Sequence, residues 1–357
     1  MRLGKRIKDW LGLSPRVETS PATLTRGRLD HVVILDGTMS TLKQGHETNA
    51  GMLYKLLCEE VPIRRLSLRY EAGIQWRNWR SSRDVIEGRG INRQIRRAYG
   101  FVASRYRPGD RIFLLGYSRG AYAVRSLAGV IDQVGLLKAE HANVRNITQI
   151  YRFYQQNAAG PAQAAFTAKY CHASTPIEAL GVFDTVKALG LRLPIIWRWT
   201  ETTHRFHNHD LGPHIRHGFH ALARDETREA FEPVLWTTKD DHPGVVEQMW
   251  FKGAHGDIGG QLDGFEVARP LANIPLVWML ERLEACGLPL PEGWRGRFPC
   301  DPNVPSVGTT RGWGKFFIAR RKRAIGLDTS EAIHPSALGL AEQSNADSAA
   351  TLVSDAR

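Results

Sequence analysis

Four largely apolar runs divide the chain, and each leads into a loop that contains glycine, serine or aspartate. They cover residues 31–35, 111–115, 179–183 and 245–251, with a weaker run at 66–70. Such runs are typical of parallel strands, which are buried on both faces. The stretches 91–106, 121–133 and 271–285 between them predict helices. This alternation predicts an α/β fold: a doubly wound, mostly parallel sheet with helices on both faces.

The two ends of the chain differ from this pattern. Residues 1–27 begin with an apolar stripe at helical spacing (Leu3, Ile7, Trp10, Leu11), interleaved with lysine and arginine. A basic amphipathic helix of this kind can lie on an anionic membrane, or it can pack on the domain or fray. Prolines and hydroxyl residues at 15–23 then predict a linker. We expect the α/β domain to span 28–339 and the tail at 340–357 to be disordered.

The composition is that of an ordinary folded protein, but the formal net charge of +12 is high. No nucleic-acid-binding motif accompanies this charge, so we expect no nucleic acid partner. An anionic membrane surface, or solubility alone, remains as its explanation. No apolar run is long enough for a membrane span or a secretory signal. The chain is therefore expected to be made in the cytoplasm, with peripheral membrane binding or signal-independent export as alternatives.

The strand at 111–115 leads into Gly116-Tyr117-Ser118-Arg119-Gly120, which fits G-x-S-x-G, and a helix of small residues follows. This strand–turn–helix setting is what a nucleophile elbow requires, and it indicates an α/β-hydrolase-like fold. Gly116 and Gly120 suit a turn too tight for side chains at those positions. We therefore interpret Ser118 as a nucleophile. The alternatives are a plain turn or a phosphate-binding loop, although no Gly-Lys-Ser/Thr follows.

A serine hydroxyl needs a base, and in this fold the order along the chain is serine, acid, histidine. Asp184 directly follows the strand at 179–183, and His255 lies in a glycine-rich loop after the strand at 245–251. These residues are the predicted acid and base. Asp184 could instead cap a helix or turn, and Asp257 is an alternative acid that more easily braces the loop.

An acyl-transfer site also needs backbone N–H groups for the oxyanion. The amide of Arg119 follows the nucleophile, and Gly37 and Thr38 lie in the loop after an earlier strand, behind Asp36. These three amides are the predicted donors. Asp36 and Asp257 are the predicted supporting carboxylates. Asp36-Gly37-Thr38 could equally be only a turn with a capping aspartate.

Three other features leave alternatives open. The histidines at 204–220 lack a metal-site spacing, so no metal is predicted, and no other motif predicts a cofactor. Residues 187–218 could form a lid over the site or simply pack on the domain. The apolar and then basic stretch 316–323 could dock on anionic head groups or form a solvated basic helix face.

Taken together, the motifs resemble a bacterial α/β-hydrolase family that includes the type VI secretion phospholipase effectors. The matching segments are 35–38, 48–49, 90–135, 180–186, 220–226, 250–260, 271–279 and 333–336. By this resemblance Ser118, Asp184 and His255 stand where the family carries its triad, and glycerophospholipids are the implied substrates. The sequence departs from the family at Gln261 and Leu262, where the family usually has glycine and an aromatic residue.

The leading hypothesis is thus a serine esterase or phospholipase that works through an acyl-enzyme, with an ester or phospholipid as its substrate. A small-acyl esterase or thioesterase without a membrane role is one alternative. A non-catalytic module that binds a membrane or a partner is another. The sequence does not fix the oligomeric state.

Overall fold

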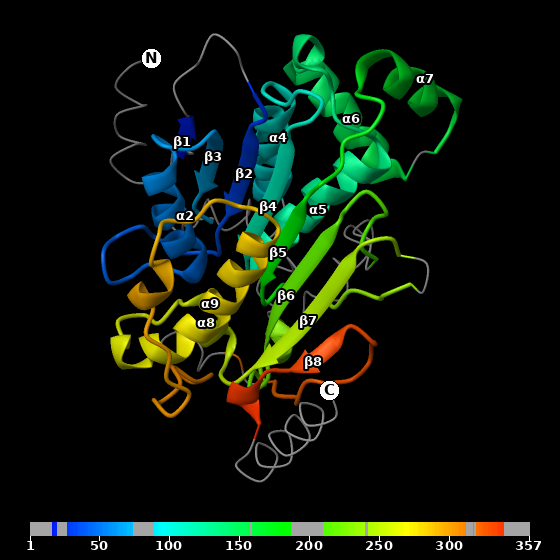
Figure 1. The fold of residues 1–357 in the computed structure, drawn as a ribbon. Coiled ribbons are helices and arrows are strands. Elements are labelled where there is room, and N and C mark those ends of the chain that lie inside the picture. The colour runs from blue at the N-terminus through cyan, green and yellow to red at the C-terminus, as the bar shows by residue number, and fades with distance from the viewer. Residues whose placement is uncertain are drawn as a thin grey trace, which may run out of the picture.

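The computed structural model describes residues 16–19, 27–73, 89–157, 159–186, 210–239, 242–311, 317 and 319–338. One eight-stranded sheet runs through this part of the chain in the order β1-β3-β2-β4-β5-β6-β7-β8 (Figure 1). Strands β2 to β8 pair in parallel, and β1 pairs antiparallel with β3 at the edge. The predicted doubly wound, mostly parallel α/β fold is confirmed.

The strands of the described part are β1 (Arg16–Thr19), β2 (Asp30–Leu35), β3 (Leu66–Glu71), β4 (Arg111–Tyr117), β5 (Ala179–Phe183), β6 (His217–Ala223), β7 (Val245–Phe251) and β8 (Glu331–Ile333). The α-helices are α2 (Asn49–Glu60), α4 (Arg89–Ala103), α5 (Arg119–Gln133), α6 (Val144–Gln156), α7 (Pro161–Tyr170), α8 (His255–Gly259) and α9 (Arg269–Ala285). Short 3₁₀ turns lie at Ala139–His141, Glu229–Phe231, Glu266–Ala268, Trp294–Arg297 and Pro335–Ala337.

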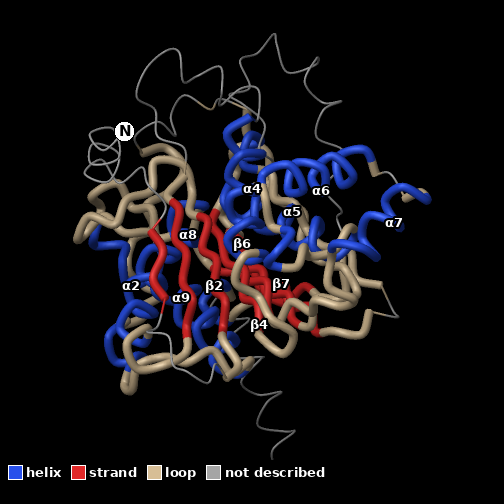
Figure 2. Tube along the Cα trace, turned by 90° about the horizontal axis from the view of Figure 1, so that it is seen from above, coloured by secondary structure: helices blue, strands red, loops and turns tan. Residues whose placement is uncertain are grey.

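The sheet has a separate apolar core on each face. Along β2, Val33 and Leu35 belong to the core that contains the buried residues of α4, α5 and α6. Val32 and Ile34 belong to the core under α2 and α9. Successive strand residues point to opposite faces, so a strand covered on both sides must be apolar at every position. The view along the sheet shows the two helical layers with the strands between them (Figure 2).

The order of the strands places a topological switch point at β2. After β2 the chain adds β3 on one side of β2, and it then returns to add β4 on the other side. Ligands of open α/β sheets bind outside the carboxyl ends of the strands at such a switch point. The loops that follow β2, β4, β5, β6 and β7 all emerge at this edge, because these strands run parallel.

Two predicted segment boundaries need correction. Residues 16–19, assigned from the sequence to the N-terminal segment and linker, form strand β1. The segment 187–218 is not all lid or insertion, because His217 and Gly218 already belong to β6. Residues 187–209, the apolar stripe at 3–11 and the tail at 340–357 lie outside the described residues. No helix in the described part has the length and apolar character needed to cross a bilayer.

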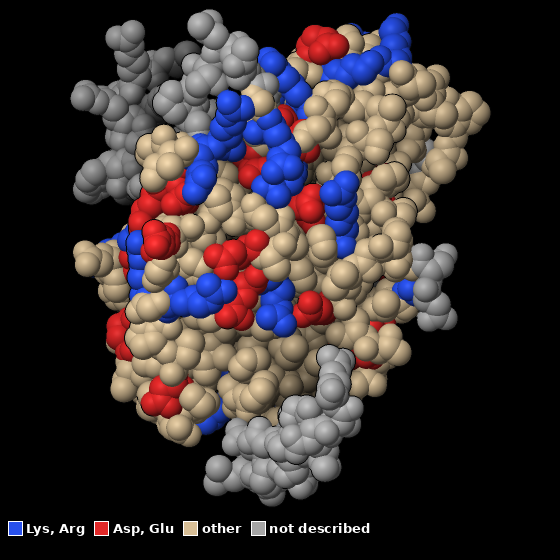
Figure 3. Space-filling model, in the orientation of Figure 1, with Lys and Arg blue, Asp and Glu red and all other residues tan. Residues whose placement is uncertain are grey.

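The surface does not gather the positive charge in one place on the face seen in Figure 3. Lysine and arginine side chains stand beside aspartate and glutamate there. Ion pairs join several exposed arginines to acidic partners, among them Arg295 to Glu284 and Arg297 to Glu59. Interspersed charges of this kind favour solubility over a single docking patch.

Candidate active site

Ser118 lies at the turn between β4 and α5, with φ 56° and ψ −119°. A positive φ is strained for a residue with a side chain and persists only where the surroundings enforce it. Gly116 and Gly120 allow the backbone on either side of Ser118 to pack closely in this turn. A Cβ atom on Gly120 would lie 2.0 Å from the carbonyl oxygen of Leu35, and one on Gly116 would lie 2.7 Å from that of Gly120. The strand–turn–helix expected around Ser118 is thus present.

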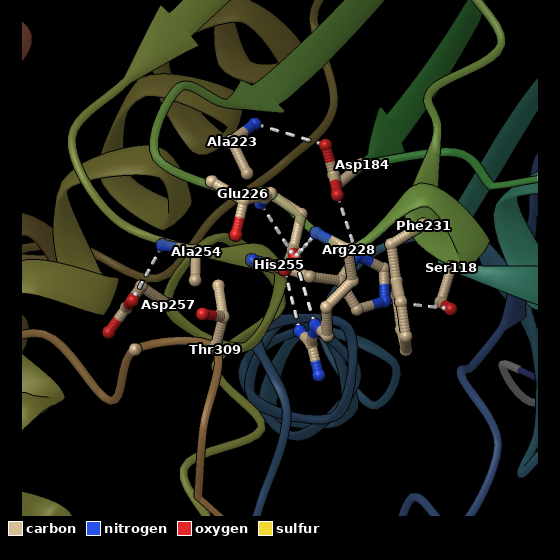
Figure 4. Close-up of polar contacts among 12 residues, drawn as sticks. Ser118, Asp184, Ala223, Glu226, Arg228, Phe231, Ala254, His255, Asp257 and Thr309 are labelled. Atoms are coloured by element: carbon tan, nitrogen blue, oxygen red, sulfur yellow. Dashed lines mark hydrogen bonds and ion pairs between the residues drawn. The ribbon is translucent and has the colours of Figure 1, made fainter. Parts of the chain in front are cut away.

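His255 opens helix α8 directly after β7, and its imidazole lies between Ser118 and Asp184 (Figure 4). The Nε2 atom is 2.9 Å from Ser118 Oγ, and the Nδ1 atom is 2.6 Å from Asp184 Oδ2. The bond to the carboxylate favours the tautomer with its proton on Nδ1, so Nε2 can accept the serine proton. The structure therefore brings together the three side chains that the sequence singled out as nucleophile, base and acid.

Asp184 follows β5 and is fully buried. Its Oδ1 accepts hydrogen bonds from the amide of Ala223 at 3.0 Å and from Arg323 Nη1 at 2.6 Å, while Arg323 Nη2 is 2.9 Å from Oδ2. Burial alone would raise the pKa of this carboxyl. The Arg323 charge and the hydrogen bond from His255 outweigh burial, and the pKa is well below its usual range. Asp184 is therefore an ionised partner for the imidazole.

Arg323 is a partner of Asp184 that was not predicted from the sequence. The stretch 316–323 was expected to dock on head groups or to form a solvated basic helix face. Arg320, Arg321 and Lys322 are exposed there but do not form a helix, and Arg321 pairs with Glu232. Arg323 differs from them, because its side chain is only 4% exposed. Besides Asp184, Arg323 donates to the carbonyl oxygens of Ala223 and Phe231. Nothing in a run of basic residues marks the one that pairs with a carboxylate 139 positions away.

The loop after β6 holds the histidine loop in place. Asp225 Oδ2 accepts from the amide of Gly253 at 2.7 Å, and Glu226 Oε2 accepts from the amide of His255 at 3.2 Å. Burial tends to raise the pKa of Glu226, but its ion pair with Arg228 lowers it. Strand β6 was not predicted from the sequence. Residues 218–223 are apolar or small except for His220, and Arg-Asp-Glu follows them, which is the signal that could have found both residues, since acidic residues also follow β2 and β5.

Aromatic rings fix the imidazole from two sides. The ring of Tyr117 lies 4.9 Å from that of His255 between centroids, and the ring of Phe231 lies 4.8 Å away. Arg228 in turn stacks on Phe231, with its guanidinium carbon 4.0 Å from the ring centroid. A histidine that is held between rings and bonded at both nitrogens has little freedom to rotate.

Asp257 is not bonded to the imidazole. Its Oδ2 accepts from the amide of Ala254 at 2.8 Å and from Ser306 Oγ at 2.5 Å, and its Oδ1 accepts from the amide of Val307 at 2.8 Å. Burial raises its pKa. In Figure 4 its carboxylate lies toward Ala254, on the side of His255 away from Ser118. Asp257 thus braces the loop, which was its favoured role, and the alternative of Asp257 as the acid is not supported.

The turn after β2 lies against the nucleophile, because a Cβ atom on Gly37 would be 3.4 Å from the Cβ of Ser118. Asp36 is buried there, and its carboxylate accepts from the Gly37 amide at 2.7 Å and from the hydroxyls of Thr48 and Tyr70 at 2.6 Å each. Burial raises the pKa of Asp36 despite these bonds. Asp36 therefore shapes the turn, as predicted for a supporting carboxylate.

The same bond corrects the list of expected oxyanion donors. The Gly37 N–H already donates to Asp36, so it does not point freely into the site. Within the described part of the chain, no hydrogen bond occupies the amides of Thr38 and Arg119. The first N–H groups of a helix have no partner within that helix, which explains the free amide of Arg119. Thr38 and Arg119 remain as the two candidate donors.

A cavity of about 290 Å³ adjoins this turn. Its lining is mostly polar and comprises Met39, Ser40, Thr41, Lys43, His46, Thr48, Gln261, Leu262 and Asp263. Gln261 Nε2 donates to the carbonyl oxygen of Thr38 at 3.2 Å. The two positions at which the sequence departs from the family pattern, Gln261 and Leu262, thus line a cavity beside the candidate oxyanion turn.

The histidines that were considered for a metal site have separate partners. His214 pairs with Asp132, and His217 bonds to the carbonyl oxygen of Glu178. His220 is buried and accepts from the amide of Thr185. His217 and His220 lie on β6, not in a loop or on a helix as expected. Among the residues that the structure describes, no three histidine, cysteine or acidic side chains converge as metal ligands do.

Comparison with known families gives a match over most of the chain. The model of the catalytic domain of Tle1-like phospholipase effectors of the type VI secretion system (T6SS) matches residues 30–282. This range contains Ser118, Asp184 and His255, and it ends before Arg323. The family match therefore covers all three residues of the hydrogen-bonded chain from Ser118 to Asp184.

Individual relatives are more distant. An uncharacterized protein of Saccharomyces cerevisiae is 29% identical over 157 residues, which are 41% of this chain and 22% of that protein. The Tle1 effector bound to the VgrG spike of the type 6 secretion system is 20% identical, with a TM-score of 0.34 over 68% of this chain and 52% of that chain. An esterase of Thermogutta terrifontis with bound propionate is 14% identical, with a TM-score of 0.38 over 78% and 91%. The chain thus spans about a fifth of the yeast protein and about half of the effector chain.

Proposed function

We propose that this chain, which belongs to the family of Tle1-like catalytic domains of type VI secretion phospholipase effectors, hydrolyses carboxylic esters of phospholipids through a serine acyl-enzyme. Membership in the family makes it a hydrolase of the lipase and esterase type. The serine mechanism, the residues that carry it and the phospholipid substrate are the proposal. Delivery by a secretion system is likewise proposed, on the family description alone.

One observation carries the mechanism. Ser118 Oγ, His255 and Asp184 form a continuous hydrogen-bonded chain with steps of 2.9 and 2.6 Å at the carboxyl edge of a parallel sheet. These distances are within the range in which a base can take the proton of a nucleophile. An isolated serine would be a poor nucleophile at neutral pH, and this arrangement is what activates it.

In the proposed reaction, Ser118 Oγ attacks the ester carbonyl carbon while His255 Nε2 accepts the hydroxyl proton. The ionised Asp184 stabilises the imidazolium that forms. The amides of Thr38 and Arg119 hold the oxyanion of the tetrahedral intermediate. As the intermediate collapses, the ester C–O bond breaks and His255 returns the proton to the leaving alcohol. A water molecule then repeats these steps on the acyl-enzyme and releases the fatty acid.

The direct test is Ser118→Ala, assayed for release of fatty acid from phospholipid in mixed micelles. We expect kcat to fall by about 10³-fold or more, because the covalent route is lost. Ser126→Ala is the matched control, since Ser126 is a buried serine on the helix that follows Ser118, and its hydroxyl bonds to the carbonyl oxygen of Tyr122 and to the side chain of Tyr154. Phospholipid hydrolysis that persists in a folded Ser118→Ala variant would rule out the acyl-enzyme.

A further inference from the structure

The cavity beside the candidate oxyanion turn is lined by two loops, one after β2 and one after α8. The first loop reaches the nucleophile, because a Cβ atom on Gly37 would lie 3.4 Å from the Cβ of Ser118. The second loop is joined to the first by the hydrogen bond from Gln261 Nε2 to the carbonyl oxygen of Thr38 at 3.2 Å. The lining begins at Met39, the residue after Thr38, and adjacent Cα atoms are about 3.8 Å apart. The cavity therefore adjoins the place where the ester carbonyl would be held.

The lining of this cavity suits a polar group. Met39 and Leu262 are its apolar members, and the other side chains carry hydroxyl, amide, imidazole, amino or carboxyl groups. A fatty acyl chain is stabilised by burial against apolar surface, of which this lining offers little. The volume of about 290 Å³ is at the lower end for ligand pockets, which begin at about 300 Å³. The cavity is thus suited to a small polar part of the substrate rather than to its chains.

Three ionisable side chains line the cavity without a hydrogen-bonded partner. Within the residues that the structure describes, no hydrogen bond or ion pair involves the side chains of Lys43, His46 and Asp263. His46 and Arg228 lie close enough to Asp263 to act on its carboxylate electrostatically. Arg228 is already paired with Glu226 at 2.6 Å. Polar groups that converge on a cavity next to a nucleophile and have no partner in the protein point to a ligand.

Lys43 and Asp263 carry opposite charges, and they come from the two different loops. A purely anionic group would be attracted by Lys43 and repelled by Asp263, and a purely cationic group would meet the reverse. A group that carries both charges can place each one beside its opposite. In a zwitterionic glycerophospholipid the phosphodiester is a few bonds from the ester, and the ammonium is a few bonds further. With the ester at Ser118, a head group that turns toward the oxyanion turn enters this cavity.

We propose that this cavity binds the head group of a zwitterionic phospholipid, with Lys43 at the phosphodiester and Asp263 at the ammonium. The inference rests on the proposed hydrolase function and deepens it, because it names the part of the substrate that is recognised. The hydrogen-bonded chain from Ser118 to Asp184 performs the chemistry on an ester, and the cavity selects which phospholipid presents that ester.

The test of Asp263 compares two phospholipids that share the phosphodiester and differ in the ammonium. The ratio of kcat/KM for phosphatidylethanolamine to kcat/KM for phosphatidylglycerol with the same chains is measured in the same neutral detergent micelles. We expect Asp263→Asn to lower this ratio about fivefold, because an ion pair at a solvent-accessible site is lost. Asp263 has φ 50°, and asparagine tolerates this conformation, so the loop should keep its shape. Glu292→Gln removes an exposed carboxylate outside the cavity and should leave the ratio unchanged.

The test of Lys43 uses the group that both phospholipids share. Lys43→Gln should lower kcat/KM for either phospholipid about fivefold relative to the diacylglycerol with the same chains, and it should change the ratio between the two phospholipids little. Lys169→Gln, at an exposed position on α7, is the matched control. An unchanged ratio in Asp263→Asn would overturn the inference. Losses of equal size on all three substrates in either variant would also overturn it, because they indicate a structural role.

A second measurement does not depend on catalysis. Binding of a short-chain dialkyl-ether phosphatidylethanolamine, which has no ester to cleave, is compared with binding of the matching phosphatidylglycerol, both as monomers in solution. Wild type should bind the phosphatidylethanolamine more tightly, and Asp263→Asn should lose most of this difference. Equal binding of the two lipids by wild type would contradict the inference. If wild type hydrolyses no ester, the proposed function fails, while this binding difference still decides the role of the cavity.

Discussion

Asp36 and Asp184 occupy equivalent places in two regions of the molecule, yet their environments differ. Each directly follows a buried parallel strand, β2 or β5, and each is almost fully buried. Asp36 is surrounded by neutral donors, namely one amide and the hydroxyls of Thr48, Tyr70 and Ser40. Asp184 faces the imidazole of His255 and the guanidinium of Arg323.

Burial pushes the pKa of both carboxyls upward, and the partners decide the outcome. Neutral hydrogen bonds do not overcome burial at Asp36, so its pKa is raised. The positive charge of Arg323, with the hydrogen bond from His255, does overcome burial at Asp184, so the pKa of Asp184 is lowered. An aspartate at a strand end that has only neutral donors around it is suited to shape a turn. One that has a cation beside it stays ionised and is suited to support a charged imidazole.

The largest expected effect separates the two aspartates by activity. Asp184→Asn should lower kcat by about 10³ to 10⁴-fold, because an amide neither favours the correct histidine tautomer nor stabilises the imidazolium. Asp36→Asn should lower kcat by about tenfold at most, since its amide oxygen can still accept from Gly37 and the three neighbouring hydroxyls can rotate. Steady-state hydrolysis of one phospholipid by both variants checks this. Similar losses in the two variants would contradict the comparison.

Arg323 provides a second, smaller test of the same difference. Arg323→Met removes the cation that holds the pKa of Asp184 low, so the Asp184–His255 pair becomes easier to protonate. The other charges near the imidazole, Glu226 and Arg228, remain paired with each other. The acid limb of kcat/KM should therefore move to higher pH by about one unit or more.

The matched control for this prediction is Arg323→Lys, which keeps the charge and should leave the acid limb within a few tenths of its position. A role of Arg323 in folding alone would lower activity without moving the limb. An acid limb that is the same in wild type and Arg323→Met would show that Arg323 does not act on the acid.

The smallest expected effect is on the free energy of unfolding. The two aspartates should contribute to it on opposite sides of pH 3.8, which is the ordinary aspartate pKa. The folded pKa of Asp184 is lower, so its contribution is complete above pH 3.8 and is lost as the pH falls through the folded value. The folded pKa of Asp36 is higher, so its contribution is present below pH 3.8 and is lost as the pH rises. Each unit of pKa difference is worth about 1.4 kcal/mol.

Urea unfolding midpoints between pH 2.5 and 7 measure this directly. Replacement of Asp184 by Asn should remove pH dependence on the acid side of 3.8, and replacement of Asp36 by Asn should remove it on the other side. If both replacements change the same pH range in the same direction, the two carboxyls do not differ as the structure indicates.

The sequence predicted the strand at 179–183 well, because β5 is buried at every position, and the expected bounds agree with β5 at both ends. The expected strand at 245–251 also agrees with β7 at both ends, although β7 is only partly buried. Strand β6 was missed because its two histidines interrupt the apolar pattern, and the segment was judged by its histidine spacing instead. Both histidines are hydrogen-bonded inside the sheet, which the pattern of residue types does not express.

Some residues of the candidate site could likewise be predicted from the sequence, and others could not. Ser118, Asp184 and His255 could be predicted, because each lies at or just after the end of a strand and the fold requires them in that order. Arg323 could not, since its contact with Asp184 joins residues that are 139 positions apart. The occupied amide of Gly37 was also out of reach, because it depends on which way the side chain of Asp36 turns.

The central claim is that the hydroxyl of Ser118 is activated by His255, and labelling with a fluorophosphonate probe tests it most directly. We expect the probe to react with wild type at Ser118, identified by mass spectrometry of the labelled peptide, and to react far more slowly with His255→Asn. Rapid labelling of Ser118 that does not depend on His255, or no labelling of the folded wild type at Ser118, would contradict the account.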